Sequence, residues 1–328
     1  MLRLAPTSCC IVGSIVAAGL APLAGAQSAG LFPELSLASA YASQDASKPS
    51  IPEKPREDLQ LPQKDVFQAK TVEVKAGELK EEQPVGEYDQ PVWSTFRRFP
   101  STRVYLQTPP GGAQFEQWIQ MRNPKDDSNA ETRLSQELEF GLGHRLQLDL
   151  YMNELHVRDG VDSTYDWSGY AMELRYALAD WDEIWGNPTL YLEYLFNDQN
   201  HDGADSIEPK LLFGGEITTG WHWGINFAHE RTFAGENDRL EESSFFASIS
   251  RTIVDSAFSA GASTEVTYES SPNSDPFGTS RVHETSVYLG PSFQFIPHPR
   301  AAIDFEPMWG LTGESLRTKI YIIFSWHF

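Results

Sequence analysis

The chain ends in the ten residues KIYIIFSWHF, 319–328, and this stretch decides the fold class. Every second residue from Ile320 to Phe328 is apolar, and most of the residues between them are polar. Such an alternation indicates a β-strand with one dry face and one wet face. A dry face of this kind contacts either a protein core or membrane lipid, and the rest of the sequence has to distinguish the two.

The N-terminus has the layout of a secretory signal peptide. Arg3 precedes a short apolar run, and small residues follow up to Ala26. This arrangement predicts that residues 1–26 are a signal peptide, cleaved after Ala26. The chain has 2 cysteines, Cys9 and Cys10. We therefore expect no cysteine in the mature chain, although it is exported to a compartment where disulfides form.

The charge and the hydropathy pattern exclude several classes of function. The chain has 25 Lys+Arg and 46 Asp+Glu, with a net charge of −21. So acidic a chain is a poor candidate for binding nucleic acid or an anionic membrane surface. After residue 26 no stretch has the ~18 apolar residues of a transmembrane helix. If this chain enters a membrane, it must cross as strands.

Residues 27–110 are rich in proline and charge, as in KPSIPEKPREDLQLPQKD. Neither the helical nor the strand period persists there, and such a composition buries too little apolar surface to fold. We expect a largely extended or disordered segment in the periplasm. The alternatives are a tether to peptidoglycan or to a partner, and a plug for a pore.

From residue 111 to residue 328, segments of about ten residues alternate apolar and polar positions, as in RLQLDLYMN (145–153) and TLYLEYLFN (189–197). Tight turns such as Gly143-His144 alternate with longer polar connections. Short turns at one rim and long loops at the other are typical of an outer-membrane barrel. The sequence predicts an all-β, transmembrane, antiparallel up-and-down β-barrel of about 12 strands, with 14 as the alternative.

One connection on the short-turn side, ADWDEIWGNP (179–188), is longer than the others. It contains Trp181 and Trp185. Tryptophan is enriched where a membrane protein crosses the lipid interface, so we expect both residues in an interfacial aromatic girdle.

The last strand resembles the assembly signal of Gram-negative outer-membrane β-barrels, through Phe324, Trp326 and Phe328. This resemblance implies that the dry face contacts outer-membrane lipid and that the barrel-assembly machinery is a partner. A second resemblance covers roughly residues 111–328 and is carried by segments such as ELEFGLGHRLQLDL (137–150). These look like the phenol meta-degradation, MetA-like outer-membrane proteins. That family implies a transporter of hydrophobic or aromatic compounds and brings no catalytic motif.

The polar face of the predicted strands is acidic. Facing the lumen, carboxylates favour cations and repel anions. The alternative is an interior packed with interlocking charged side chains that passes little. The candidate lumen and selectivity residues are Glu137, Glu139, Asp149, Glu173, Arg175, Glu193, Glu216, Glu230, Glu265, Asp304, Glu306 and Lys319.

A calcium-like pattern lies in the predicted loop 198–208. Asp198, Asn200 and Asp202, followed by glycine, match the opening of a Ca²⁺-binding loop. The twelfth position is Pro209 where a bidentate glutamate is needed. An ordinary exposed loop rich in Asp, Asn and Gly is the alternative. No other cofactor is expected.

These observations predict a passive outer-membrane channel or transporter for small or hydrophobic solutes, and no enzyme. One alternative is a structural barrel that links the outer membrane to periplasmic partners through residues 27–110. Another is a lipid hydrolase at the outer rim, which needs a nucleophile and a histidine. The candidate residues for these roles are His229, His283 and Ser286. No recognised motif surrounds these three residues.

Overall fold

The computed structural model describes residues 78–126, 129–159, 162–197, 204–234, 240–272 and 281–328. The chain divides into two compact units, Met1–Leu61 and Pro62–Phe328, and every described residue belongs to the second. The expected signal peptide and the calcium-like residues Asp198, Asn200 and Asp202 lie outside the described residues. No helix in the described part is long and apolar enough to cross a membrane.

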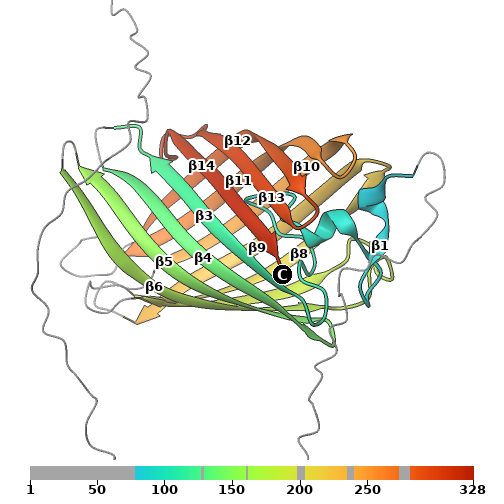
Figure 1. Cartoon of the computed structure of the whole chain (residues 1–328). Helices are drawn as coiled ribbons and strands as arrows, with labels where there is room; N and C mark the ends of the chain where they lie inside the picture. Colours follow the sequence, from blue (N-terminus) through green and yellow to red (C-terminus); the bar gives the residue numbers. More distant parts are fainter. Residues whose placement is uncertain (1–77, 127–128, 160–161, 198–203, 235–239, 273–280) are drawn as a thin grey trace, which may run out of the picture. The chain divides into compact units, whose positions relative to one another are not determined.

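Twelve antiparallel strands form a closed barrel (Figure 1). Each strand pairs with its neighbours in sequence, and β14 closes the barrel on β3 with Ile322 opposite Ile119. The predicted fold class and strand number are confirmed. The strands are β3 (Ala113–Asn123), β4 (Ala130–Gly143), β5 (Leu146–Asp159), β6 (Asp162–Ala177), β7 (Thr189–Asn197), β8 (Asp205–Thr218), β9 (Trp221–Ala234), β10 (Glu241–Val254), β11 (Phe258–Pro272), β12 (Arg281–His298), β13 (Ala301–Gly310) and β14 (Thr318–His327).

The alternation of the sequence determines which side chains face outward. On β14 Phe324 and Trp326 are exposed, whereas Ile323 and Ser325 are fully buried. The same division of exposed apolar and buried polar side chains recurs on β5 and β6. A closed barrel also pairs its backbone groups between strands, which the hydrocarbon core of a membrane requires. The dry face of the final strand therefore points away from the barrel interior, toward lipid.

Short and long connections alternate around the barrel, as the sequence predicts. Turns of two or three residues join β4 to β5, β8 to β9, β10 to β11 and β12 to β13, and we call their end the short-turn rim. Longer connections join most of the strand pairs at the other end, the long-loop rim. The connection at 160–161 is shorter than expected, because β5 and β6 remain paired up to Asp159 and Asp162.

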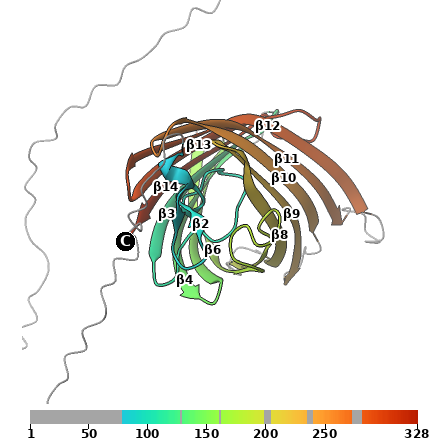
Figure 2. The ribbon, with the colours of Figure 1, turned by 90° about the vertical axis from the view of Figure 1, so that its right-hand side faces the viewer.

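Residues 78–112 lie before the first barrel strand, and we call them the plug. They comprise a 3-10 turn, η1 (Lys80–Glu82), two short paired strands, β1 (Pro84–Val85) and β2 (Gln90–Pro91), a second 3-10 turn, η2 (Val92–Thr95), and an irregular stretch up to β3. Figure 2 shows the region of β2 within the ring of barrel strands. Nearly every residue from 90 to 109 is buried.

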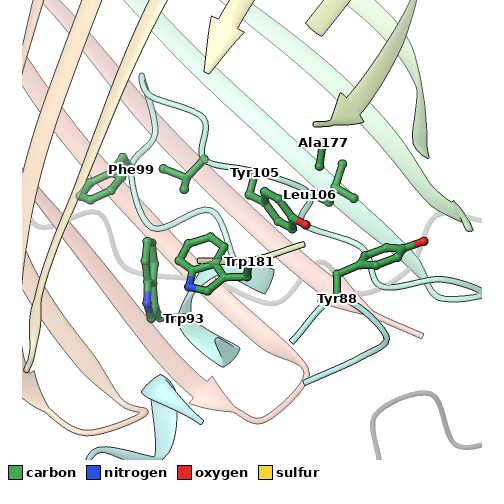
Figure 3. Close-up of a cluster of buried hydrophobic side chains, with 8 residues drawn as sticks. Tyr88, Trp93, Phe99, Tyr105, Leu106, Ala177 and Trp181 are labelled. Atoms are coloured by element: carbon green, nitrogen blue, oxygen red, sulfur yellow. The ribbon is translucent and has the colours of Figure 1, made fainter. Parts of the chain in front are cut away.

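A hydrophobic core joins the plug to the barrel wall (Figure 3). The Trp93 ring of the plug meets Trp181 of the β6–β7 connection edge-on, at 5.6 Å between centroids. Tyr105 packs on the other side of Trp181 at 5.3 Å, and its hydroxyl donates to the Ala179 carbonyl over 2.8 Å. The composition of residues 27–110 predicts a largely extended or disordered segment. Residues 78–110 have a defined fold instead, because their aromatic side chains pack against the barrel wall.

The two tryptophans of the β6–β7 connection have different environments. Trp181 is only 8% exposed, so its expected place in an interfacial girdle is wrong: it packs inward on the plug. Trp185 is 83% exposed and stacks on Trp223 at 5.5 Å. The connection is longer than the other short-rim turns because it also covers the plug.

Candidate functional site

The plug is fixed to the short-turn rim at the point where it enters the barrel. The carboxylate of Asp255, in the β10–β11 turn, accepts hydrogen bonds from the backbone amides of Lys80 (2.9 Å) and Glu81 (3.1 Å). The Glu81 carboxylate binds the guanidinium of Arg98 at 3.0 and 3.3 Å. The rim turn thus binds η1, and η1 in turn binds Arg98 in the barrel interior.

Arg97 neutralises carboxylates on the first two strands. Its Nε lies 2.7 Å from Glu116 of β3, and its Nη2 lies 3.3 Å from both Glu137 and Glu139 of β4. The guanidinium also lies over the Trp118 ring, 4.2 Å from its centroid. All three carboxylates are fully buried. Without a cation their burial would be strongly unfavourable, so Arg97 and the wall require one another.

Arg103 continues the same network deeper along the wall. Its Nη2 lies 3.3 Å from Glu137 and 3.5 Å from Glu173, and it donates to the Tyr151 hydroxyl over 2.7 Å. The wall itself adds Arg175 to this network, which binds Asp149 at 3.0 Å and also pairs with Glu173. Acidic strands β4–β6 are therefore neutralised partly by the wall and partly by the plug.

Side-chain amides of the wall bind the plug backbone. The Asn226 Oδ1 of β9 accepts from the Arg103 amide, and its Nδ2 donates to the Arg103 carbonyl, each at 2.7 Å. On β5 the Gln147 Oε1 accepts from the amides of Gln107 (2.8 Å) and Thr108 (3.0 Å). These bonds satisfy plug backbone groups that lie far from water.

Two glycines on the lumen face of β8 and β9 make room for the plug. A Cβ placed on Gly214 would lie 2.4 Å from the Val104 Cγ1 atom, and one on Gly224 would lie 2.9 Å from both Val104 and Thr102. Real Cβ atoms do not approach so closely. The plug therefore packs against bare backbone at these positions, and any larger side chain would displace it.

A cavity of about 240 Å³ lies beside the plug residues Pro100, Ser101 and Arg103. We call it the vestibule. Its wall combines aromatic rings with a few charged and amide groups: Trp118, Tyr151, Tyr191, Phe246, Tyr321, Glu193, Lys210, Asn153, Asn226 and Ser135. Lys210 reaches over the Tyr191 ring at 4.3 Å and binds Glu208 at 2.6 Å. Such a mixture of rings and polar groups is typical of small-molecule sites.

The structure divides the sequence-predicted lumen residues into three sets. Those in direct contact with the plug network are Glu137, Glu139, Asp149, Glu173 and Arg175, and Glu216, which accepts from the Trp93 indole over 3.0 Å. Those nearer the long-loop rim are Glu193, Glu230, Glu265 and Lys319, of which Lys319 binds Glu265. Asp304 and Glu306 are fully buried on β13, and no lysine or arginine of the described residues lies within ion-pair distance of either.

The histidines considered for a hydrolase lie apart from one another. His229 Nδ1 is 3.0 Å from the Ser243 hydroxyl, and His283 Nδ1 is 2.9 Å from the Tyr268 hydroxyl. Within the described part of the chain, neither ring has a carboxylate partner, and no hydrogen bond connects either ring to Ser286. The base of a hydrolytic triad needs such an orienting group.

Three groups of acidic and histidine side chains have the spacing of metal ligands, but in each group an arginine already binds at least one of the side chains. Arg97, Arg103 and Arg175 bind the carboxylates of the first two groups, Glu116/Glu137/Glu139 and Glu137/Asp149/Glu173. The third is Glu82/Glu216/His222. There the His222 Nδ1 lies 2.9 Å from the Arg98 Nη2. A guanidinium only donates, so Nδ1 accepts and the hydrogen resides on Nε2. The nitrogen that faces Glu82 is then unavailable to a metal.

Burial and neighbouring charge shift the pKa values of plug residues. Burial raises the pKa of Glu82, and the charges of Glu81 and Asp255 act in the same direction. Burial alone would lower the pKa of Arg103, but its neighbours, above all the carboxylate of Glu137, together outweigh burial, and the pKa is raised. Arg103 therefore stays fully charged inside the barrel.

Sequence reasoning missed the plug arginines Arg97, Arg98 and Arg103, and the wall residues Glu116, Gln147 and Asn226 that bind the plug. A usable signal lay in VWSTFRRFPSTRVYLQ (92–107), which is rich in aromatic residues and arginine. The preceding residues are rich in proline and acid instead. The lumen is consequently less acidic than the wall alone indicates.

Together the closed barrel, its apolar exterior and its occupied interior define a membrane-spanning β-barrel with an internal plug. Neither a protein-family model nor a curated relative matches the chain. The resemblance to the MetA-like family therefore stays a prediction.

Several solved structures are similar to this chain. An outer membrane channel from Pseudomonas putida F1 has a TM-score of 0.47 and 10% identity, over 67% of this chain and 96% of its own. The NanC porin has a TM-score of 0.43 and 14% identity, over 64% of this chain and 98% of its own. The KdgM porin has a TM-score of 0.43 and 9% identity, over 66% and 99%.

Proposed function

We propose that the protein is a passive outer-membrane channel for small solutes, which the plug closes from the short-turn rim. The observation that carries the proposal is the charge pairing of Arg97 and Arg103. These two cations neutralise the wall's buried carboxylates, yet they belong to a segment that is not itself part of the wall. A barrel built only as a closed support could carry all its cations on its strands, as it carries Arg175.

The direction of closure follows from the rims. In outer-membrane barrels the short turns face the periplasm and the long loops face outward. The plug would then enter from the periplasm, and the vestibule would lie on its outer side, open to arriving solutes. In this orientation the predicted periplasmic segment 27–110 would approach from the periplasm, with its residues 78–110 inside the lumen. The proposal includes insertion of the barrel by the barrel-assembly machinery, which would recognise Phe324, Trp326 and Phe328.

Plug withdrawal would change the ion preference of the lumen. Without Arg97 and Arg103, the carboxylates of Glu116, Glu137 and Glu139 would line the passage with Arg175 as their nearest wall cation. A passage with that charge should favour cations and repel anions. The acidic lumen that the sequence predicts would thus exist in the open state, after the plug has left.

The test is a planar-bilayer measurement on the refolded mature chain and on a variant that lacks residues 27–110. We expect low conductance from the mature chain and steady openings from the variant, with a reversal potential that favours K⁺ over Cl⁻. Anion preference in the variant would contradict the acidic passage. Equal conductance of both proteins would contradict closure by the plug.

Two alternatives receive less support. For a rim hydrolase, neither His229 nor His283 has an orienting carboxylate among the described residues, so no observation favours this activity. A tether would depend on residues before 78, for which the described part of the chain offers no observation. Loss of a cell-envelope phenotype on deletion of 27–77, with conductance unchanged, would favour the tether.

A further inference from the structure

On β13 two carboxylates of the lumen wall lie beyond ion-pair distance of any lysine or arginine of the described chain. Asp304 and Glu306 lie on the lumen face of β13, and neither has any exposed surface. No lysine or arginine of the described chain lies within ion-pair distance of either carboxylate. This sets them apart from Glu137 and Glu173, which have arginine partners, and from Glu265, which has Lys319. Two buried carboxylate charges with no cation in direct contact are strongly unfavourable.

The surroundings of these carboxylates consist of oxygen atoms with unused capacity. Gln294 Nε2 donates to one Asp304 oxygen over 2.9 Å, and Ser263 Oγ donates to one Glu306 oxygen over 2.7 Å. Ser101 of the plug also approaches Glu306 as a hydrogen-bond donor. The second Asp304 oxygen, Oδ2, has no hydrogen-bond partner, and neither does Gln294 Oε1 or Ser292 Oγ. Both Gln294 and Ser292 are at least nine-tenths buried. Their unpartnered atoms therefore lie in the interior, beside the charges.

Strand register brings these side chains together. Gln294 of β12 pairs with Asp304 of β13, and the same antiparallel register places Ser292 opposite Glu306. Opposite residues have Cβ atoms about 5 Å apart, and residues two apart on one strand are separated by about 7 Å. Four oxygen-bearing side chains thus stand at the corners of a small rectangle on one face. Side chains of this length can converge on a single ion at the ~2.4 Å typical of calcium.

We propose that Asp304, Glu306, Gln294 and Ser292 bind one hard divalent cation, Ca²⁺ or Mg²⁺, inside the barrel. The donors are all oxygen, which such cations prefer over the nitrogen and sulfur ligands of softer metals. The two carboxylate charges match the charge of the ion. The site is separate from loop 198–208, and it does not depend on whether the barrel conducts.

The experiment measures metal content in protein refolded without lipopolysaccharide, exposed to CaCl₂ and MgCl₂, and then gel-filtered. The proposal expects about one equivalent of metal in the wild-type chain, the occupancy of a single site. The double variant Asp304→Asn, Glu306→Gln should bind at least about tenfold more weakly. Chelation should lower the thermal midpoint of the wild-type chain and leave that of the double variant unchanged.

Two control variants locate the metal. Glu230→Gln removes a lumen carboxylate elsewhere and should retain the metal. Asp198→Ala should also retain it; loss of the metal in this variant would assign the ion to the loop and overturn the proposal. A wild-type chain without metal overturns it as well, because the carboxyls would then hold protons. If the double variant fails to fold, the metal content and the chelator response of the wild-type and control proteins decide whether the proposed site holds the metal.

Discussion

Replacing Arg97 and Arg103 by methionine should open the channel and loosen the plug. Methionine keeps part of the side-chain length without the charge, so Glu116, Glu137 and Glu139 lose their nearest plug cations. Removing one partner of a buried ion pair costs about 3–5 kcal/mol. Because about 1.4 kcal/mol is a factor of ten, the undocked fraction of the plug should rise at least about a hundredfold. Bilayer conductance and trypsin cleavage within residues 78–112 measure the two effects.

A matched control and a rescue test the physical cause. Arg122→Met removes a lumen arginine that is partly exposed and pairs with Glu131 at 3.4 Å, so its effect should stay below about 1 kcal/mol. Adding Glu137→Gln and Glu139→Gln to the Arg97→Met, Arg103→Met protein removes the unpaired charge and should restore much of the closure. A double arginine variant that stays silent and resists trypsin would contradict the role of these pairs.

Trp93→Ala should have an effect of similar size through packing. Trp93 is fully buried, contacts Trp181 and donates its indole N–H to Glu216. Truncating a buried tryptophan to alanine costs about 3–5 kcal/mol. Because the lost contacts join plug and wall, the cost should fall on plug docking, and the barrel itself should survive. Amide exchange in residues 90–108 should accelerate, while exchange in the β strands stays slow.

Two substitutions separate packing from other causes. Trp93→Phe keeps an aromatic ring and loses the indole hydrogen bond, so it should cost about 1–3 kcal/mol. Trp185→Ala removes an exposed tryptophan of the same β6–β7 connection and should leave plug exchange unchanged. Equal effects of Trp93→Ala and Trp185→Ala would show that the plug is not held by this core.

The barrel could be predicted from the sequence because the pattern that defines each strand lies within the strand itself. A strand that faces lipid on one side must alternate, and Ile320, Ile322 and Phe324 show that period without reference to any partner. The alternation of short and long connections then distinguished the two rims of the barrel. The same local rule placed Glu137, Asp149 and Glu173 on the polar face of their strands, and in the structure all three side chains are buried.

The plug could not be read in the same way. Its residues follow no period, because they are held by contacts with distant strands: Arg97 with β3 and β4, Asn226 with the Arg103 backbone, and Val104 with Gly214. Trp181 was misplaced for the same reason, since a tryptophan in a rim connection can face lipid or a filled lumen. Only the three-dimensional arrangement shows which surface it meets.

The most direct test of the account is a reversible lock between plug and wall. The mature chain, expected to lack cysteine, accepts a Thr102→Cys, Ser248→Cys pair. Thr102 lies in the plug and Ser248 on β10, and their hydroxyl oxygens are 2.7 Å apart, which brings the two substituted side chains within disulfide reach. The pair is placed in the Arg97→Met, Arg103→Met background, and single-channel conductance is recorded before and after reduction. We predict silence when the disulfide is formed and steady cation-selective openings after dithiothreitol. Openings that persist with the disulfide intact would contradict closure of the lumen by the plug.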